Sequence, residues 1–382
     1  MIEQHEREER VSPIELSFDL VFVFGFTQVT TVLSNNTTWS GLEHALLLLV
    51  TLWWAWTAYA WLTNAVDPSD GFFLGTIMIA MAAMFVAAFA VPEAFGRHGV
   101  VFGVAFLIVA VMQLLLYALA ARGDRDLFAA ILCVAPFALA GSLLILAAGF
   151  VDGWAKPLLW FMALCVGLFG PLFIDLSGWR VHPAHFVERH GLIVIIAIGE
   201  SLVAIGIGAR GTGLGAGEIV AAVIGFFVAA SFWLAYFDFF TIRGQQLLME
   251  RSGTPQIALA RDVYTYLHLP MVAGIVLFAF GLKTTLAHVG GELAAIPAAG
   301  LCGGPALYLL GYVGIRLRIS GTVSSGRFVT AIACAVLVLV ALTVPALLAL
   351  ALLASVWAAL HAYELIRYRE ARAETRALRA SA

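Results

Sequence analysis

Apolar runs of about 20 residues recur along the whole 382-residue chain, separated by short segments that carry Gly, Pro and charged residues. A run of about 20 apolar residues is the length that an α-helix needs to cross the hydrocarbon core of a bilayer. Hydrophobic residues make up 62% of the chain and charged residues only 12%. The sequence therefore predicts an all-α integral membrane protein whose main partner is the lipid bilayer.

The boundaries of the runs predict twelve transmembrane helices. The last two could be read as one helix, but about 40 apolar residues are too many for a single crossing, and Pro345 lies where a turn is needed. The predicted spans are 13–34, 40–62, 71–92, 99–121, 128–150, 157–177, 186–209, 216–240, 264–285, 294–315, 328–344 and 346–366.

The positions of the basic residues agree with this number of spans. Lysine and arginine accumulate in cytoplasmic loops and at cytoplasmic helix ends. If the N-terminus is inside, twelve spans place seventeen of the 21 Lys and Arg residues on the cytoplasmic side. A wrong number of spans would scramble this alternation. We therefore expect both termini to be cytoplasmic.

Composition also excludes several function classes. The net charge of −3 is small and the basic residues form no patch of the kind that binds nucleic acid, so no nucleic-acid partner is expected. The four cysteines lie in apolar runs without a CxxC pair, which predicts reduced packing residues. The sequence contains neither a phosphate-binding loop nor a nucleophile elbow, so no motif indicates a soluble catalytic domain. The charged first residues predict no cleavable signal peptide.

The two halves of the chain show a faint internal repeat. When the first and seventh spans are aligned, Glu15 falls on Glu188, and Thr27-Gln28 falls on Glu200-Ser201. Six spans per repeat would give both halves the same orientation, related by an axis along the membrane normal. The expected organisation is a first six-helix repeat at 1–178, a second at 179–368 and a cytoplasmic basic tail at 369–382.

Two carboxylates enter the first predicted span on one helical face. Glu15 and Asp19 are spaced i, i+4, so their side chains are neighbours. This pair predicts either a proton or cation site, or acceptors for neighbouring helix ends and Arg residues. Ser12-Pro13 resembles a helix start, where acidic residues are also favoured.

Residues 182–208 combine a cluster of ionisable side chains with an apolar stretch that contains Glu200 near its middle. An acidic residue at the centre of a membrane helix costs about 2.5–3.5 kcal/mol and usually faces a bundle interior or a wet cavity. At about 1.5 Å per residue, Glu188 and Glu200 lie about 18 Å apart along one helix. They are predicted to mark the mouth and the interior of one membrane path.

His185, Glu188 and His190 are candidate metal ligands, because His and carboxylate side chains bind transition metals. Asp238 or His268 could complete such a centre. The spacing is not diagnostic of a metal site, and the alternative interpretation is an interfacial network of hydrogen bonds and ion pairs with Arg189. Both interpretations stay open at this point, and no cofactor is predicted.

The predicted topology places the polar candidates on one side of the membrane, which predicts a cytoplasm-facing vestibule with Glu200 deeper inside. The aromatic residues at 53–61 are expected to be interface anchors, and Glu364 at a span end is expected to be solvated. The residues expected to line the path of an ion, proton or substrate are Glu15, Asp19, Glu188, His190, Glu200, Asp238 and His268.

Several segments together resemble the bacterial low-temperature-requirement A family, and the block at 185–206 is the most specific of them. The resemblance covers nearly the whole chain. It implies a multi-pass protein of the bacterial cytoplasmic membrane, from a family named for a cold-growth phenotype. The segments are ELSFDLVFVFGFTQ at 15–28, WWAWTAYAWLTN at 53–64, VPEAF at 91–95, HFVERHGLIVIIAIGESLVAIG at 185–206, WLAYFDFF at 233–240 and YLHLPMVAGIVLFAFGL at 266–282.

A weaker resemblance connects the first span to the lysosomal and bacterial potassium channels built from six-helix repeats. Glu15, Asp19, Val21 and Phe22 follow the order of their first-helix signature. The match is incomplete, because the Arg that precedes that signature is displaced here and the second repeat has Leu192 where Asp19 would fall. Potassium selectivity is therefore not implied.

These features favour a transporter or channel for an ion or small solute, with proton coupling through intramembrane carboxylates. Two other classes remain. One is a membrane-embedded enzyme with a cytoplasm-facing His and carboxylate site, acting on a lipid-linked or small apolar substrate. The other is a membrane sensor or structural protein. The sequence leaves the transported species and the oligomeric state open.

Overall fold

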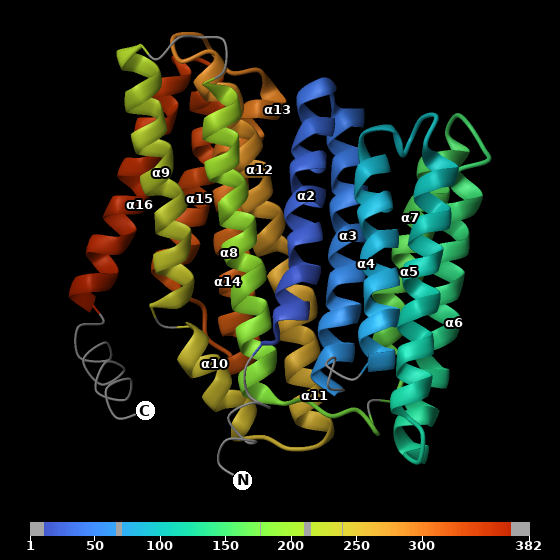
Figure 1. Ribbon diagram of the computed structural model, residues 1–382. Coiled ribbons are helices and arrows are strands. Elements are labelled where there is room, and N and C mark those ends of the chain that lie inside the picture. Colours follow the sequence, from blue (N-terminus) through green and yellow to red (C-terminus); the bar gives the residue numbers. More distant parts are fainter. Residues whose placement is uncertain (1–10, 66–70, 176, 210–214, 239, 368–382) are drawn as a thin grey trace. The chain divides into compact units, whose positions relative to one another are not determined.

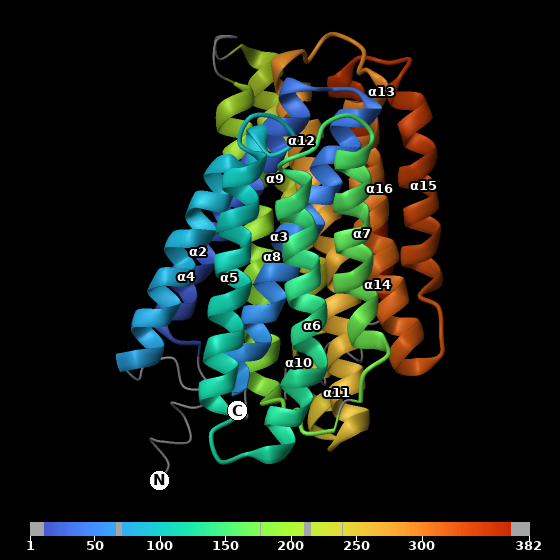
Figure 2. The same ribbon diagram turned by 90° about the vertical axis from the view of Figure 1, so that its right-hand side faces the viewer.

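The computed structural model describes residues 11–65, 71–175, 177–209, 215–238 and 240–367, and nearly all of them lie in long helices (Figures 1 and 2). The predicted basic tail at 369–382 lies outside these residues. The elements are α2 (Pro13–Asn35), α3 (Trp39–Ala65), α4 (Gly71–Ala90), η1 (Val91–Glu93), α5 (Gly99–Ala120), α6 (Arg125–Ala148), α7 (Ala155–Phe169), η2 (Gly170–Leu172), α8 (Pro183–Gly208), α9 (Ala216–Phe237), α10 (Phe240–Met249), α11 (Thr254–Ala260), η3 (Arg261–Leu267), α12 (His268–Ala287), α13 (Ala295–Ala298), η4 (Ala299–Gly303), α14 (Gly304–Ser320), α15 (Ser325–Ala341) and α16 (Ala346–Arg367).

The prediction of an all-α membrane protein is confirmed. Within the described residues, eleven helices are long and apolar enough to cross a membrane. Each predicted span coincides with a helix, but the helix at the eleventh position, α15, has only 17 residues. At about 1.5 Å per residue it would reach about 26 Å, slightly less than the hydrocarbon thickness of about 30 Å. The number of twelve crossings and the orientation of the chain stay predictions.

The segment between the eighth and ninth predicted spans is itself helical. It contains α10 and α11, and a π-helix, η3, joins α11 to α12 without a break. The ninth helix therefore begins at Thr254, ten residues before the predicted start at 264. Its first turns carry polar residues such as Gln256, Arg261 and Asp262, so hydropathy alone places the beginning of the helix too late.

The chain divides into two compact units. Unit 1 comprises residues 1–190 and 248–260, and unit 2 comprises residues 191–247 and 261–382. The division falls inside α8, so its first two turns belong to unit 1 and the remainder belongs to unit 2.

In unit 1, α2 packs against α3 and α4, α5 contacts α3, α4 and α6, and α7 contacts α3 and α6. The aromatic residues of α3 form the centre of this packing, because Trp53 and Trp56 are completely buried and Tyr59 is 1% exposed. The Tyr59 hydroxyl donates a hydrogen bond of 2.9 Å to the carbonyl of Val109 in α5. The prediction that this stretch anchors the protein at the membrane interface is therefore wrong for these three side chains.

In unit 2, α12 contacts α9, α14 and α16, and α15 packs against both α14 and α16. The contact between α12 and the chain from η4 to α14 depends on glycine. A methyl group at Gly274 would collide with the carbonyl of Gly304, and one at Gly281 would collide with the backbone of Leu301. Small residues allow such close approach of membrane helices.

Chemical labelling tests the orientation of the chain. In a variant without the four native cysteines, we expect a cysteine at Ser252 to react with a membrane-impermeant maleimide only from the cytoplasmic side. A cysteine at Asn36 should react only from the opposite side. Both positions lie in short segments between helices. Labelling of both from the same side would contradict the alternation of basic residues on which the topology is based.

Candidate functional site

The site in unit 1 begins at the first turn of α2. Ser12 and Glu15 form a capping box, in which the Ser12 hydroxyl accepts the Glu15 N–H at 3.4 Å and Glu15 Oε2 accepts the Ser12 N–H at 2.9 Å. The Ser12 hydroxyl also lies 2.9 Å from Glu15 Oε2. Glu15 is only 2% exposed although it is close to the helix end. The cap thus holds the carboxylate in one rotamer that points into unit 1.

Asp19 lies one turn further along the same face and is 1% exposed. Its Oδ1 atom accepts two hydrogen bonds of 2.8 Å, from the Trp56 indole N–H of α3 and from the Arg189 guanidinium of α8. Its Oδ2 atom accepts no hydrogen bond from any described residue. Asp19 is therefore held at one oxygen while its second oxygen is buried without a donor.

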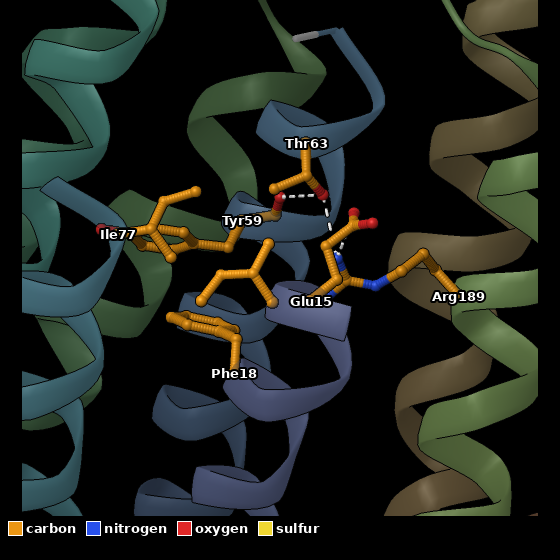
Figure 3. A pocket seen from close by; sticks show the side chains of 7 residues that line it. Glu15, Phe18, Tyr59, Thr63, Ile77 and Arg189 are labelled. Atoms are coloured by element: carbon orange, nitrogen blue, oxygen red, sulfur yellow. Dashed lines mark hydrogen bonds and ion pairs between the residues drawn. The ribbon is translucent and has the colours of Figure 1, made fainter. Parts of the chain in front are cut away.

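Arg189 joins the two carboxylates, and Figure 3 shows its contact with Glu15. Its Nη1 atom donates to Glu15 Oε1 at 2.6 Å and to the Thr63 hydroxyl at 2.9 Å, and its Nη2 atom donates to Asp19. The guanidinium carbon lies 5.8 Å from the centre of the Trp56 ring, and Arg189 is fully buried. We call Glu15, Asp19 and Arg189, with Trp56 and Thr63, the Arg189 cluster.

The charges of the Arg189 cluster do not balance. Two carboxylates share one guanidinium, so the cluster carries one excess negative charge when both acids are ionised. Buried ions are stable only when they are paired and hydrogen-bonded. Glu15 meets this condition with four hydrogen bonds, whereas Asp19 Oδ2 does not. The arrangement can take up one positive charge.

A narrow pocket lies beside the Arg189 cluster. Figure 3 shows the Glu15 and Arg189 side chains pointing toward each other next to Phe18 and Tyr59. No part of the pocket is wide enough for a water molecule. The lining residues are Ile14, Glu15, Phe18, Tyr59, Thr63, Ile77 and Arg189.

The structure separates the three candidate metal ligands. His185 is buried, and its Nε2 atom lies 3.1 Å from Glu15 Oε2. Glu188 is exposed and accepts the backbone N–H of Val11 at 3.3 Å. The Nδ1 atom of His190 lies 2.8 Å from the carbonyl of Phe186, and its ring packs edge-on against Trp56 at 4.9 Å between centroids. Across the described residues, no group of three His, Cys, Asp or Glu side chains is arranged to hold a metal ion.

The other three predicted site residues belong to unit 2. Glu200 is 1% exposed in α8, and its charge interacts with that of Lys283 in α12. Asp238 is a half-buried residue at the end of α9. His268 is completely buried after η3, with Nδ1 2.8 Å from the carbonyl of Val263 and Nε2 3.0 Å from the Tyr236 hydroxyl. A vestibule shared by all seven residues stays a prediction.

Unit 2 also contains an ion pair that the sequence reasoning missed. Arg327 of α15 binds Glu364 of α16 through Nε at 2.7 Å and Nη2 at 3.2 Å, and each residue is 5% exposed. The expectation that Glu364 is solvated is therefore wrong. The presence of Arg327 in an apolar span could have indicated this pair, because an arginine in an apolar helix requires a buried partner.

The fold and the Arg189 cluster define a polytopic helical membrane protein with a buried, charge-unbalanced carboxylate site. The chain belongs to the family described as bacterial low temperature requirement A protein (LtrA), whose profile matches residues 10–362. It is 30% identical over 323 residues to an uncharacterized protein of Rhizobium meliloti (strain 1021). The aligned region covers 81% of this chain and 77% of that protein. No solved structure matches the chain significantly.

Proposed function

We propose that this LtrA-family protein is a proton-coupled transporter or channel of the bacterial cytoplasmic membrane, in which the Arg189 cluster binds and releases the proton. The observation that supports it is the excess carboxylate of the cluster, buried inside helices of membrane-spanning length. Ionisable residues at such positions are costly, and in membrane proteins they commonly belong to proton relays and ion pathways.

Geometry favours a proton over a metal cation as the balancing charge. The pocket beside Glu15 has no room for a water molecule, so a hydrated cation does not fit. A bare metal cation would need several oxygen ligands. The polar groups that line this pocket include Glu15 and Thr63, whose side-chain oxygens accept hydrogen bonds from Arg189. A proton needs only Asp19 Oδ2, or a position shared between the two carboxylates.

The packing within each unit supports the proposed internal repeat. In unit 1 the neighbouring pairs include α3 with α7, α4 with α5, α5 with α6 and α6 with α7. The corresponding pairs in unit 2 are α9 with α16, α12 with α14, α14 with α15 and α15 with α16. A hydrogen bond from a tyrosine hydroxyl to a backbone carbonyl also joins one matching helix pair in each unit. Tyr59 of α3 donates to Val109 of α5. Tyr308 of α14 donates to Phe232 of α9. Tandem repeats are frequent in transporters.

A flux measurement in liposomes tests the proposal. Asp19→Asn keeps the shape of the side chain and an oxygen acceptor for Trp56 and Arg189, but it removes the titratable charge. We expect the wild-type protein to dissipate an imposed pH gradient, detected with an entrapped pH-sensitive dye, and Asp19→Asn to fall to the rate of protein-free liposomes.

The matched control is Asp126→Asn, since Asp126 is exposed in the first turn of α6. This control should show wild-type flux, and both variants should elute as monodisperse protein in detergent. If Asp19→Asn shows wild-type flux with the same pH dependence, Asp19 does not couple protons and the proposal fails.

A further inference from the structure

The junction between the end of α3 and the start of α8 is held by one amide side chain. The Asn64 Oδ1 atom accepts the backbone N–H of His182 at 2.8 Å, and its Nδ2 atom donates to the carbonyl of His182 at 3.1 Å. The same Nδ2 atom lies 3.1 Å from Nδ1 of His185. Asn64 is 4% exposed. The backbone of His182 therefore determines which end of the amide faces His185.

This orientation determines where His185 carries its proton. An amide nitrogen only donates, so Nδ1 of His185 must accept and cannot carry a hydrogen. A neutral imidazole then has its hydrogen on Nε2, which lies 3.1 Å from Glu15 Oε2. The ring proton of His185 therefore points directly at the Arg189 cluster.

We propose that His185 transfers protons between solvent and Glu15, and that Asn64 is the positioning residue that sets the direction of transfer. This inference rests on the proposed function. The supporting observation is a gradient of exposure, because His185 in the first turn of α8 is 6% exposed, Glu15 is 2% exposed and Arg189 is fully buried. His182, directly before the start of α8, is exposed.

The transfer balances as an exchange of two protons at one ring. His185 gives the Nε2 proton to Glu15 Oε2, and Nδ1 takes a proton from solvent after Asn64 Nδ2 has moved away from it. The ring remains neutral, and proton exchange with solvent, which removes the hydrogen from Nδ1 and returns one to Nε2, restores the starting tautomer. The charged group that contacts His185 is Glu15 of α2, which is paired in turn with Arg189 of α8, and the contact from α3 is the uncharged Asn64.

Histidine-selective ¹⁵N NMR of the full-length protein in detergent, with His185→Gln to assign the signal, measures the proton position directly. We expect wild-type His185 to carry its hydrogen on Nε2 at neutral pH. In Asn64→Asp the new carboxylate accepts instead of donating, so Nδ1 should become protonated. The control Asn36→Asp, which changes the same residue type in the connection between α2 and α3, should leave the signal unchanged. A hydrogen on Nδ1 in the wild type, or an unchanged His185 signal in Asn64→Asp, would overturn the role of Asn64.

Flux measurements with the same variants test the transfer. A carboxylate beside His185 favours its charged form, so Asn64→Asp should move the midpoint of the flux–pH curve upward by about 1 pH unit or more. His185→Gln can still donate to Glu15 but cannot relay a proton, and it should lose most of the flux. If His185→Gln shows wild-type flux while Asp19→Asn is inactive, His185 does not transfer the proton. The proposed function would then remain intact. Absence of flux in the wild type would contradict the proposed function itself.

Discussion

Replacing Arg189 by glutamine is expected to lower the free energy of unfolding by about 3–5 kcal/mol, as for a broken buried ion pair. The substitution leaves Glu15 and Asp19 buried at 2% and 1% exposure without a counter-ion. It also removes the hydrogen bond to Thr63 and the contact with the Trp56 ring. Reversible unfolding by SDS in mixed micelles, followed by tryptophan fluorescence, measures the loss.

Two further variants separate charge from packing. The triple variant Glu15→Gln/Asp19→Asn/Arg189→Gln has no buried charge in the cluster and should recover most of the lost stability. Arg180→Gln is the control, since the Arg180 side chain is 77% exposed in its 3.0 Å pair with Asp124 and should change the stability by less than about 1 kcal/mol. If Arg189→Gln is no less stable than Arg180→Gln, the cluster is not a buried ionic site.

Arg327→Met is expected to produce a similar loss of about 3–5 kcal/mol in unit 2. Arg327 connects four helices, because it binds Glu364 of α16 from α15, donates to the carbonyl of Ala235 at the end of α9 and stacks on Tyr312 of α14 at 3.6 Å from the ring centre. Methionine fills much of the same space but leaves the Glu364 carboxylate buried and unpaired.

Arg318→Met provides a close comparison. Arg318 forms an Nε salt bridge of 2.8 Å with Asp262, nearly the same distance as the 2.7 Å bond between Arg327 and Glu364, but its side chain is 44% exposed. Its loss should therefore cost less than about 1 kcal/mol. The same unfolding measurement compares the two. Equal losses would show that burial does not determine the strength of these pairs.

The positions of the helices could be predicted well from the sequence, because hydropathy reports directly on which residues enter lipid. The predicted spans 13–34 and 71–92 correspond closely to α2 and α4. The prediction failed where a helix continues into polar sequence, as at Thr254, ten residues before the expected start. Helical hydrogen bonding extends through these polar residues, although they lie outside the apolar run that hydropathy detects.

The candidate site could be predicted only in part. The i, i+4 spacing of Glu15 and Asp19 places them on one face, and the pair was expected to form either a proton or cation site or acceptors for Arg residues. The partners of the pair come from α3 and α8, 37 and 170 residues away from Asp19. Trp56 shows the limit of local reasoning, because a tryptophan in a membrane helix suits the interface as well as the core.

The sequence by itself determined that the chain is a helical membrane protein, where most helices lie and which residues are costly to bury. These properties depend on length, hydropathy and spacing along one helix. Only the tertiary structure decided that Arg189 neutralises one of two carboxylates and that Asn64 directs the proton of His185. Such pairings depend on which helices lie next to each other and on how each is rotated, and an apolar run does not encode either.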